Sequence, residues 1–321
     1  MRRHSAIHTA SSPTDFRFFF RFLLAALLAL PLWADAFAAT TATTKSSVST
    51  VSEPASRYNK GLLWKIESPG TTASYLFGTI HSDDARVIAL PEAVTRSLDV
   101  SNRFVMEAII DGEALVRMAE VMFFNDQRTL EQVVGKKLYM EAIKALTARG
   151  MPTLGIEKQK PWAVMMALSM PPPKTGEYLD LVLQSRATQQ NKPVSGLETV
   201  AEQLAVFDGL PLPDQVALLQ DTVDTQADLE EEFEALHKAY LARNLGDITA
   251  ITEKNKLGDE RLYEEVMDRL LAKRNQRMVE RMKPIIKQGS AFIAVGAAHL
   301  PSEAGLLYQL EKAGYRVTVV Y

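Results

Sequence analysis

The sequence predicts an α/β fold, with a central mixed sheet formed by N- and C-terminal strand-helix-strand halves and a large helical insert between them. Short apolar runs with strand character occur near both ends of the chain, whereas residues 113–287 show helical periodicity. A repeated motif supports the two halves. A glycine stands three places before a histidine, directly after an apolar run, at residues 78–81 and again at 296–299.

We expect residues 1–38 to be a secretory signal peptide. Four arginines precede the apolar run 22–33, and a small-x-small cleavage site follows at residues 34–36 or 36–38. Cleavage there predicts a periplasmic or secreted protein with no stable membrane span. The alternative is an uncleaved anchor, which is disfavoured because Arg21 and Asp35 limit the apolar stretch to fewer than the roughly 20 residues that span a bilayer.

Residues 39–57 are rich in Ser and Thr and contain no aromatic residue, so we expect a flexible linker that cannot bury enough apolar surface to fold. Residues 58–321 are long enough for one domain with its own core.

Charge and cysteine content exclude several functions. The formal net charge is −3, and it becomes −5 once residues 1–36 are removed. No basic stripe is interleaved with aromatic residues, so nucleic acid is not an expected partner. The chain contains no cysteine, which excludes thiol nucleophiles, cysteine-zinc sites and disulfides. Catalysis would therefore use oxygen and nitrogen groups.

The N-terminal half begins with an expected antiparallel hairpin, residues 62–67 and 74–79, joined by the turn-forming sequence Ser68-Pro69-Gly70-Thr71. After the first histidine motif, Leu90-Pro91-Glu92 is typical of a helix start, and residues 103–110 predict a third strand.

The C-terminal half repeats this order. Residues 291–295 predict a strand, 302–313 a helix that Gly314 ends, and 315–321 a last strand. The two ends are interpreted as possible related halves.

Six helical stretches are expected in the insert, and a short strand before Gly196 interrupts them. His237 is interpreted as an exposed helix position without a role. The helical stretches are residues 113–124, 138–149, 161–170, 178–189, 214–240 and 262–287.

Both motif histidines, His81 and His299, fall just beyond the carboxyl end of a strand, where α/β sheets bind ligands. We therefore expect them to converge on one cleft. The glycines would allow a left-handed bend or a close backbone approach. The alternative is a strand-ending glycine followed by a histidine bound to its own loop.

Carboxylates and an arginine complete the candidate set. Glu107 ends the third apolar run, as a ligand or base in the cleft or as the first exposed residue of that segment. Glu198 precedes a helix, where capping is the alternative to catalysis. Arg274 and Asn275 are further candidates for polarising a carbonyl or holding an anion, although Arg274 is also typical of a surface helix position.

Together these motifs resemble the TraB/GumN family, within a wider group that includes the Tiki proteases and, more distantly, erythromycin esterases and haem-binding ChaN-like proteins. The resemblance covers essentially the whole domain. It implies an α/β fold with a helical insert and a divalent-metal hydrolase that uses both histidines and a glutamate. The residues that carry it are 63–66, 76–81, Glu107, 196–199, Gln203, 274–275, 295–300, 314–315 and Val317.

The mechanism expected from both arguments is hydrolysis of a peptide or amide bond, in a peptide or small-molecule substrate, rather than of a small ester. His81, His299 and Glu107 would hold Mn²⁺, Co²⁺ or Zn²⁺ with an open position for water. Glu198 would be the general base, or would exchange roles with Glu107, and Arg274 would stabilise the oxyanion.

Two alternatives remain at this stage. One is a metal-free esterase-like hydrolase in which His81 is the general base and Glu107 orients it. The other is a non-catalytic periplasmic protein that binds a ligand, with haem as one possibility. The absence of a CxxCH motif excludes covalent haem attachment. The sequence does not predict the oligomeric state.

Overall fold

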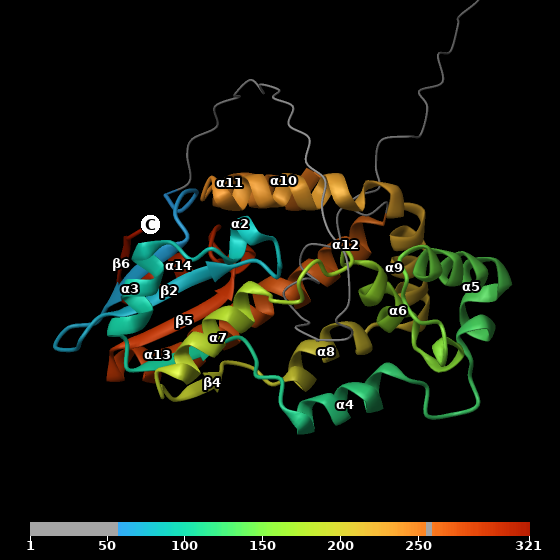
Figure 1. Cartoon of the computed structure of the whole chain (residues 1–321), viewed down its shortest axis with the longest axis horizontal. Coiled ribbons are helices and arrows are strands. Elements are labelled where there is room, and N and C mark those ends of the chain that lie inside the picture. The colour runs from blue at the N-terminus through green and yellow to red at the C-terminus, as the bar shows by residue number, and fades with distance from the viewer. Residues whose placement is uncertain (1–56, 255–258) are drawn as a thin grey trace, which may run out of the picture.

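The computed structural model describes residues 57–254 and 259–321 (Figure 1). The predicted signal peptide 1–38 and all but the last residue of the predicted linker 39–57 lie outside the described residues. A six-stranded mixed sheet with the order β4-β3-β5-β2-β1-β6 forms the centre of the molecule. The strands are β1 (Leu63–Glu67), β2 (Ser74–Thr79), β3 (Arg103–Met106), β4 (Val194–Gly196), β5 (Ala291–Gly296) and β6 (Arg316–Val319).

The strand pairing joins the two ends of the chain. β1 runs antiparallel to β2, which confirms the predicted hairpin, and it also pairs with β6. β5 lies between β2 and β3 and is parallel to both, and β3 is parallel to β4. Four neighbouring parallel strands, β4, β3, β5 and β2, therefore end at one edge of the sheet.

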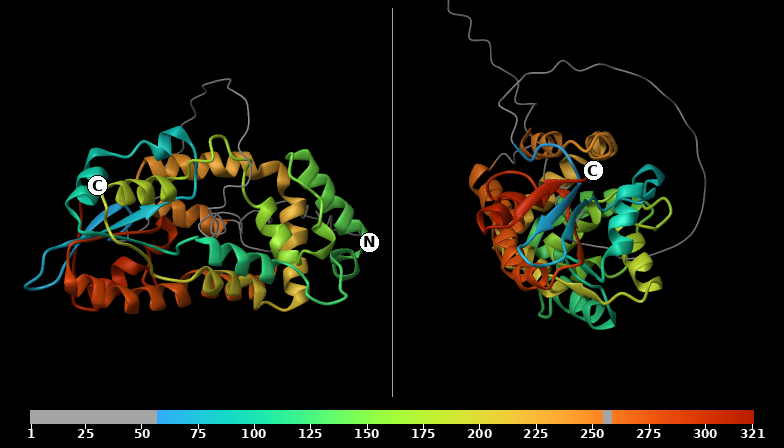
Figure 2. Two further views of the ribbon diagram at one scale, coloured as in Figure 1. Left: turned by 60° about the horizontal axis from the view of Figure 1, so that its bottom comes forward. Right: turned by 90° about the vertical axis from the view of Figure 1, so that its left-hand side faces the viewer.

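Helices cover both faces of this sheet. Figure 2 shows α13 (Lys273–Gln288) and α14 (Leu306–Lys312) on one face, with α3 (Glu92–Val100) and α7 (Leu179–Gln189) on the other. The central strand β5 is buried at every residue, as expected for a parallel strand covered on both sides. The Phe292 ring lies 6.0 Å from that of Phe77 and 6.1 Å from that of Phe104, measured between centroids, so aromatic packing ties β5 to both neighbours.

The predicted helical insert is confirmed, and β4 returns from it to the edge of the sheet. Figure 1 shows α5, α6 and α9 at the end of the molecule away from β6, and α10 and α11 running back above the sheet. None of the described helices is long and apolar enough to cross a membrane. The remaining helices are α2 (Ala85–Ile88), α4 (Gly112–Met122), α5 (Leu130–Ala148), α6 (Pro161–Leu168), α8 (Val200–Asp208), α9 (Leu212–Asp224), α10 (Leu229–Leu241), α11 (Leu245–Lys254) and α12 (Glu260–Met267).

Several predicted elements differ from the observed ones, among them the predicted helix 138–149, which begins at Leu130 as α5. The third strand ends at Met106, not at residue 110. The predicted helix 214–240 is two helices, α9 and α10, separated by a short 3-10 turn. The predicted helix 262–287 contains a π-helical turn at residues 268–272, directly before Arg274. The last helix begins at Leu306 instead of residue 302, because the chain folds tightly before it, and a Cβ on Gly305 would lie 1.8 Å from the Pro301 carbonyl oxygen.

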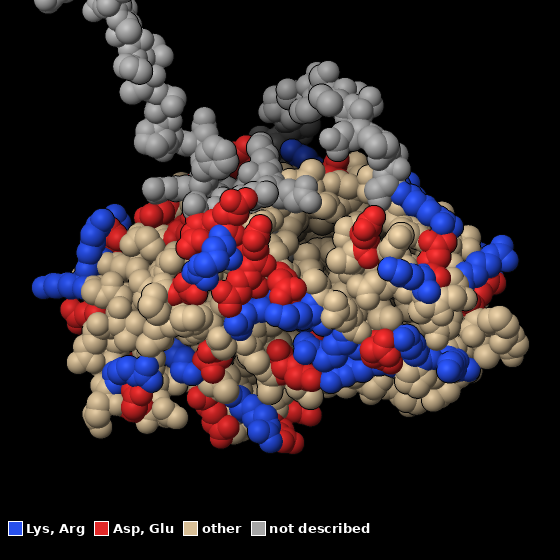
Figure 3. Space-filling model, turned by 180° about the vertical axis from the view of Figure 1, so that it is seen from behind, with Lys and Arg blue, Asp and Glu red and all other residues tan. Residues whose placement is uncertain are grey.

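The charged surface shows no segregation on the face seen from behind. Figure 3 shows acidic and basic side chains interspersed over that face. The candidate residues are instead buried at the edge of the sheet.

Candidate functional site

The structure places one candidate residue just beyond the carboxyl end of each of four adjacent strands. In strand order these are Glu198 after β4, Glu107 after β3, His299 after β5 and His81 after β2. All four are buried. The predicted convergence of strand ends is thus present in the sheet order, because parallel neighbours end at the same edge.

The two glycine-histidine motifs pack directly against each other. A Cβ on Gly78 would lie 2.7 Å from Leu300 Cδ1 and 3.1 Å from Ala297 Cα. Neither motif glycine uses the left-handed region; Gly296 has φ −54°, and Gly78 is not among the residues with positive φ. Of the two predicted roles for glycine, close backbone approach applies at Gly78 and the left-handed bend does not apply at either position.

Asn275 sets the protonation of the His299 ring. Its Oδ1 lies 2.6 Å from His299 Nδ1, while its Nδ2 donates to the carbonyl oxygen of Ala304 at 2.8 Å. Because the amide nitrogen faces that carbonyl, Oδ1 is the acceptor and His299 carries its proton on Nδ1. Burial, assisted by the positive charge of Arg274, lowers the pKa of His299 well below its usual value. The imidazole is therefore neutral and has a lone pair on Nε2.

His299 Nε2 is buried and has no hydrogen-bond partner among the described residues. The carboxylate oxygen Oε1 of Glu107 lies 3.6 Å from this nitrogen. A lone pair and a carboxylate oxygen are both acceptors, so this approach is unfavourable unless a cation or a shared proton lies between them.

The Glu107 side chain points into the protein, so Glu107 is not the exposed residue that was the alternative prediction. Its Oε1 accepts the Gly296 backbone N–H at 2.6 Å. Its Oε2 accepts from Arg274 Nη2 at 2.5 Å and from Gln203 Nε2 at 3.2 Å. The carboxylate therefore connects β3 to the second motif and to α13.

Glu198 lies between two arginines. Arg274 donates to its Oε2 through Nε at 2.9 Å and Nη2 at 2.8 Å, and Arg277 donates to its Oε1 at 2.5 Å. Glu198 is not the helix cap, because Thr199 and Glu202 form the capping box of α8. Sequence reasoning missed Arg277, which has the same pattern as any charged residue on a surface helix.

Arg274 is 1% exposed, so the expectation of a surface helix position is wrong. Burial alone would lower its pKa, but Coulombic attraction and hydrogen bonds from Glu107 and Glu198 outweigh burial and raise the pKa above its usual value. Two buried carboxylates thus share a permanently charged guanidinium.

His81 is held by a separate set of contacts. Its Nδ1 lies 3.5 Å from Asp180 Oδ2, and Thr79 Oγ1 donates to Asp180 Oδ1 at 2.7 Å. The ring stacks on Tyr178 with centroids 4.0 Å apart. Sequence reasoning missed Asp180, since an acidic residue in the first turn of a helix is usual and gave no signal of this contact.

His237 is 6% exposed, so the prediction of an exposed helix position is wrong. Its Nε2 lies 2.8 Å from Ser82 Oγ, in the segment that directly follows His81. The contact joins α10 to the first motif over 155 positions of sequence, which is why local periodicity did not reveal it.

The residues present fit part of a metal site. Two donor atoms bound to one zinc ion at about 2.1 Å each can be separated by up to about 4.2 Å, and the 3.6 Å between His299 Nε2 and Glu107 Oε1 falls within that limit. No group of three or more His, Asp or Glu side chains placed to hold a metal occurs in residues 57–254 and 259–321. The structure thus pairs two of the three predicted ligands and places His81 just beyond the end of the adjoining strand β2.

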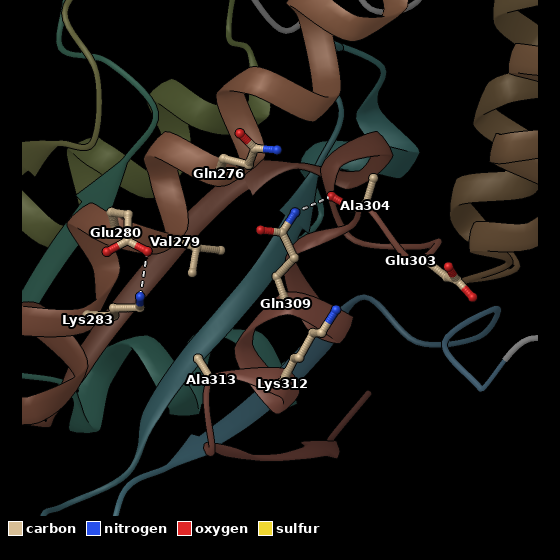
Figure 4. Close-up of a pocket in the computed structure, with 9 residues that line it drawn as sticks. All are labelled: Gln276, Val279, Glu280, Lys283, Glu303, Ala304, Gln309, Lys312 and Ala313. Carbon is tan, nitrogen blue, oxygen red and sulfur yellow. Dashed lines mark hydrogen bonds and ion pairs between the residues drawn. The ribbon is translucent and has the colours of Figure 1, made fainter.

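A surface pocket of about 400 Å³ lies elsewhere, between α13 and α14, and Figure 4 shows the polar side chains around it. None of the candidate residues lines it. Its link to the row of candidates is indirect: Gln309 donates to the Ala304 carbonyl that also accepts from Asn275. The four buried residues at the strand ends, Glu198, Glu107, His299 and His81, form the buried row. Their chemistry locates the candidate site better than this pocket does.

The fold and the paired motifs define a class of α/β proteins with two Gly-x-x-His histidines at the carboxyl edge of a mixed sheet. The chain belongs to the TraB/PrgY/gumN family, whose model matches residues 62–319.

Several curated proteins are similar to the chain. Metalloprotease TIKI2 of Danio rerio is 23% identical over 310 residues, which are 79% of this chain and 60% of that protein. Metalloprotease TIKI1 of Xenopus tropicalis is 25% identical over 312 residues, with the same shares of the two chains. The uncharacterized protein YbaP of Escherichia coli (strain K12) is 26% identical over 252 residues, 75% of this chain and 89% of its own. The chain thus spans about 60% of the length of its Tiki relatives. No solved structure matches it.

Proposed function

We propose that this protein is a divalent-metal-dependent hydrolase that cleaves peptide or amide bonds. The observation that carries the proposal is the buried, neutral His299 ring, whose unpartnered Nε2 faces Glu107 Oε1. Similarity to proteins named metalloproteases supports the same reaction class.

In this proposal His299, Glu107 and His81 hold the ion, which is Mn²⁺, Co²⁺ or Zn²⁺. The ion would supply Lewis-acid activation of water and polarisation of the scissile carbonyl. Nitrogen and carboxylate donors of this kind suit these metals.

Asn275 and Asp180 are the positioning residues. Each faces the Nδ1 atom of one histidine, which leaves the Nε2 atom of that ring for a ligand. Partners of this kind fix ring orientation and raise the basicity of ligating histidines. The two histidines therefore share one design, with an amide supporting His299 and a carboxylate supporting His81.

Arg274 holds both glutamates in the buried row, and Arg277 completes the contacts of Glu198. This arrangement favours Glu198 as the group that fixes Arg274. A general-base role for Glu198, and an oxyanion role for Arg274, stay predictions, because each would require one of these ion pairs to open.

A metal-free hydrolase is the second candidate, and the same atom favours it. A neutral histidine with a fixed tautomer and a free Nε2 can take a proton from water. This mechanism assigns the base to His299, whereas the sequence alone suggested His81. Ligand binding without turnover is the outcome to be expected if neither hydrolase proposal holds.

Export is part of the proposal as well. The basic and apolar leader 1–38 supports a periplasmic or secreted location. The proposed substrate there is a peptide or a small molecule, and nucleic acid is not a proposed partner.

The test is turnover of a fluorogenic peptide library by the purified protein before chelation, after chelation and after return of Mn²⁺, Co²⁺ or Zn²⁺. We expect cleavage that chelation abolishes and one of these metals restores. Glu107→Gln tests the proposed ligand. Its matched control is Glu280→Gln, which changes an exposed residue of the Glu280–Lys283 ion pair, away from the buried row. Cleavage that persists in chelator would support the metal-free mechanism. Saturable binding of a peptide without cleavage would overturn both hydrolase proposals.

A further inference from the structure

Helix α10 contacts the first glycine-histidine motif on both sides of its histidine. Tyr240 Oη donates to the Gly78 carbonyl oxygen at 2.9 Å, and His237 Nε2 lies 2.8 Å from Ser82 Oγ. The two α10 residues are three positions apart, so both project from one face of the helix. The two contacted residues, Gly78 of the motif and Ser82 directly after it, enclose only Thr79, Ile80 and His81.

The charges around His237 determine the direction of its bond to Ser82. Its Nδ1 faces two carboxylates, with Asp84 Oδ2 at 3.9 Å and Glu234 Oε2 at 4.0 Å. Carboxylates at that distance favour the proton on Nδ1. Nε2 then accepts the Ser82 hydroxyl proton, while Ser82 Oγ accepts the Asp84 backbone N–H at 3.1 Å. Ser82 is thus satisfied as a donor and as an acceptor.

The segment that follows is fixed just as firmly. Asp83 Oδ2 accepts three successive backbone N–H groups, from residues 174–176, at 2.5, 2.7 and 3.0 Å. Arg86 in α2 donates to Asp84 and to Glu234 of α10, so it links α2 to α10 as well. The backbone is therefore fixed on both sides of Thr79, Ile80 and His81, so the two α10 contacts bound the segment that carries the His81 ring.

We propose that His237 and Tyr240 are positioning residues for His81, through which helix α10 sets the direction of the His81 ring at the edge of the sheet. The geometry of this clamp, defined as His237–Ser82 and Tyr240–Gly78, stands without a ligand. Its consequence for metal binding rests on the proposed function.

Conservative variants of the whole protein can test the clamp. Tyr240→Phe removes one hydroxyl, His237→Leu removes the acceptor for Ser82, and His237→Gln keeps an amide group near the position of Nε2. Tyr58→Phe is the matched control, because the Tyr58 hydroxyl donates to Glu311 and not to the motif. Each variant is checked for a folded state by thermal unfolding.

The readouts are the imidazole NMR signals of His81 in metal-free protein and the dissociation constant for Mn²⁺. We expect Tyr240→Phe and His237→Leu to shift the His81 signals and to weaken Mn²⁺ binding about 10- to 100-fold. His237→Gln restores both wholly or in part, and Tyr58→Phe changes neither.

Unshifted His81 signals in folded Tyr240→Phe and His237→Leu would overturn the clamp. If the His81 signals move while wild-type protein binds no metal, the clamp stands and the metallohydrolase proposal fails. Tyr240→Phe removes a single oxygen atom, so it keeps the test decisive even if His237→Leu does not fold.

Discussion

Asn275 fixes the tautomer of His299, because its Oδ1 lies 2.6 Å from Nδ1 while its own amide nitrogen is bound to the Ala304 carbonyl. The consequence is a neutral imidazole that presents a lone pair, buried and without a hydrogen-bond partner in the described structure, toward Glu107. An unpaired polar atom of this kind costs stability and is retained where it has a function. The proposed chemistry depends on this pair.

Asn275→Ala should therefore weaken metal binding without removing a ligand. Loss of the Oδ1 contact frees the ring to rotate and to exchange tautomers, and we expect Co²⁺ affinity to fall about 10- to 100-fold. Asn275→Asp, which keeps an acceptor at Nδ1, should lose less. Isothermal titration with Co²⁺ measures both variants, and equal affinity for wild type and Asn275→Ala would contradict the positioning role.

Arg274→Met should be strongly destabilising. It leaves Glu107 and Glu198 buried without the guanidinium that they share, and breaking a buried ion pair from one side costs about 3–5 kcal/mol. Urea unfolding gives the change in free energy. The triple variant Arg274→Met with Glu107→Gln and Glu198→Gln should recover part of that loss, since no charge then remains unpaired. An additive or larger loss in the triple variant would count against the shared-charge explanation.

Gly78→Ala should disrupt the packing between the two motifs. The new methyl group would lie 2.7 Å from Leu300 Cδ1 and 3.1 Å from Ala297 Cα, and overpacking of this kind costs about 1–3 kcal/mol. Gly112→Ala is the control, because there the added Cβ has no atom within 4 Å beyond the adjacent residues and the backbone of its own helix. Adding Leu300→Ala should relieve part of the Gly78→Ala strain in thermal unfolding; equal unfolding of Gly78→Ala and Gly112→Ala would show that the close approach is not tight.

The stability of the protein should fall on acidification below about pH 6.5, in part through His237. Burial lowers the pKa of His237 in the folded state. The positive charges of Arg86 and Lys174 lower it further, whereas the negative charges of Asp84 and Glu234 raise it and only partly offset the effect of burial. The unfolded chain then binds more protons than the folded chain between the two pKa values. Unfolding free energy therefore rises with pH in that window, by at most about 1.4 kcal/mol per pH unit for one such group.

Denaturant unfolding of wild type and His237→Gln from pH 5 to pH 8 checks this sign. We expect a smaller slope below about pH 6.5 in the variant and parallel curves at higher pH. Identical slopes in both proteins would mean that His237 titrates alike in the folded and unfolded states.

Much of the fold could be predicted because its signals are local. The hairpin, the short apolar strands and the helical periodicity are all properties of adjacent residues, and the structure confirms them. The rule that parallel strands end at one edge also anticipated where Glu107 and His299 lie. The insertion of β5 between β2 and β3 could not be read from any local pattern.

The residues that sequence reasoning misjudged are those whose environment is set by distant segments. The sequences around Arg274 and His237 show ordinary helical periodicity. Their hydrogen-bond partners in the buried environment are two glutamates and a serine that are 76 to 167 positions away. Asp180 was missed for the same reason, since its partners Thr79 and His81 belong to another strand and loop. Motif spacing predicted the proposed ligands His81 and His299, but not the groups that orient them.

The most direct test of the proposed metal site is stoichiometric metal binding by the purified protein, measured by elemental analysis and by titration with Mn²⁺, Co²⁺ and Zn²⁺. The proposal requires one tightly bound ion per chain, lost in His299→Ala, His81→Ala and Glu107→Gln and retained in Glu280→Gln. Absence of binding at micromolar metal, or undiminished binding by His299→Ala, would contradict it.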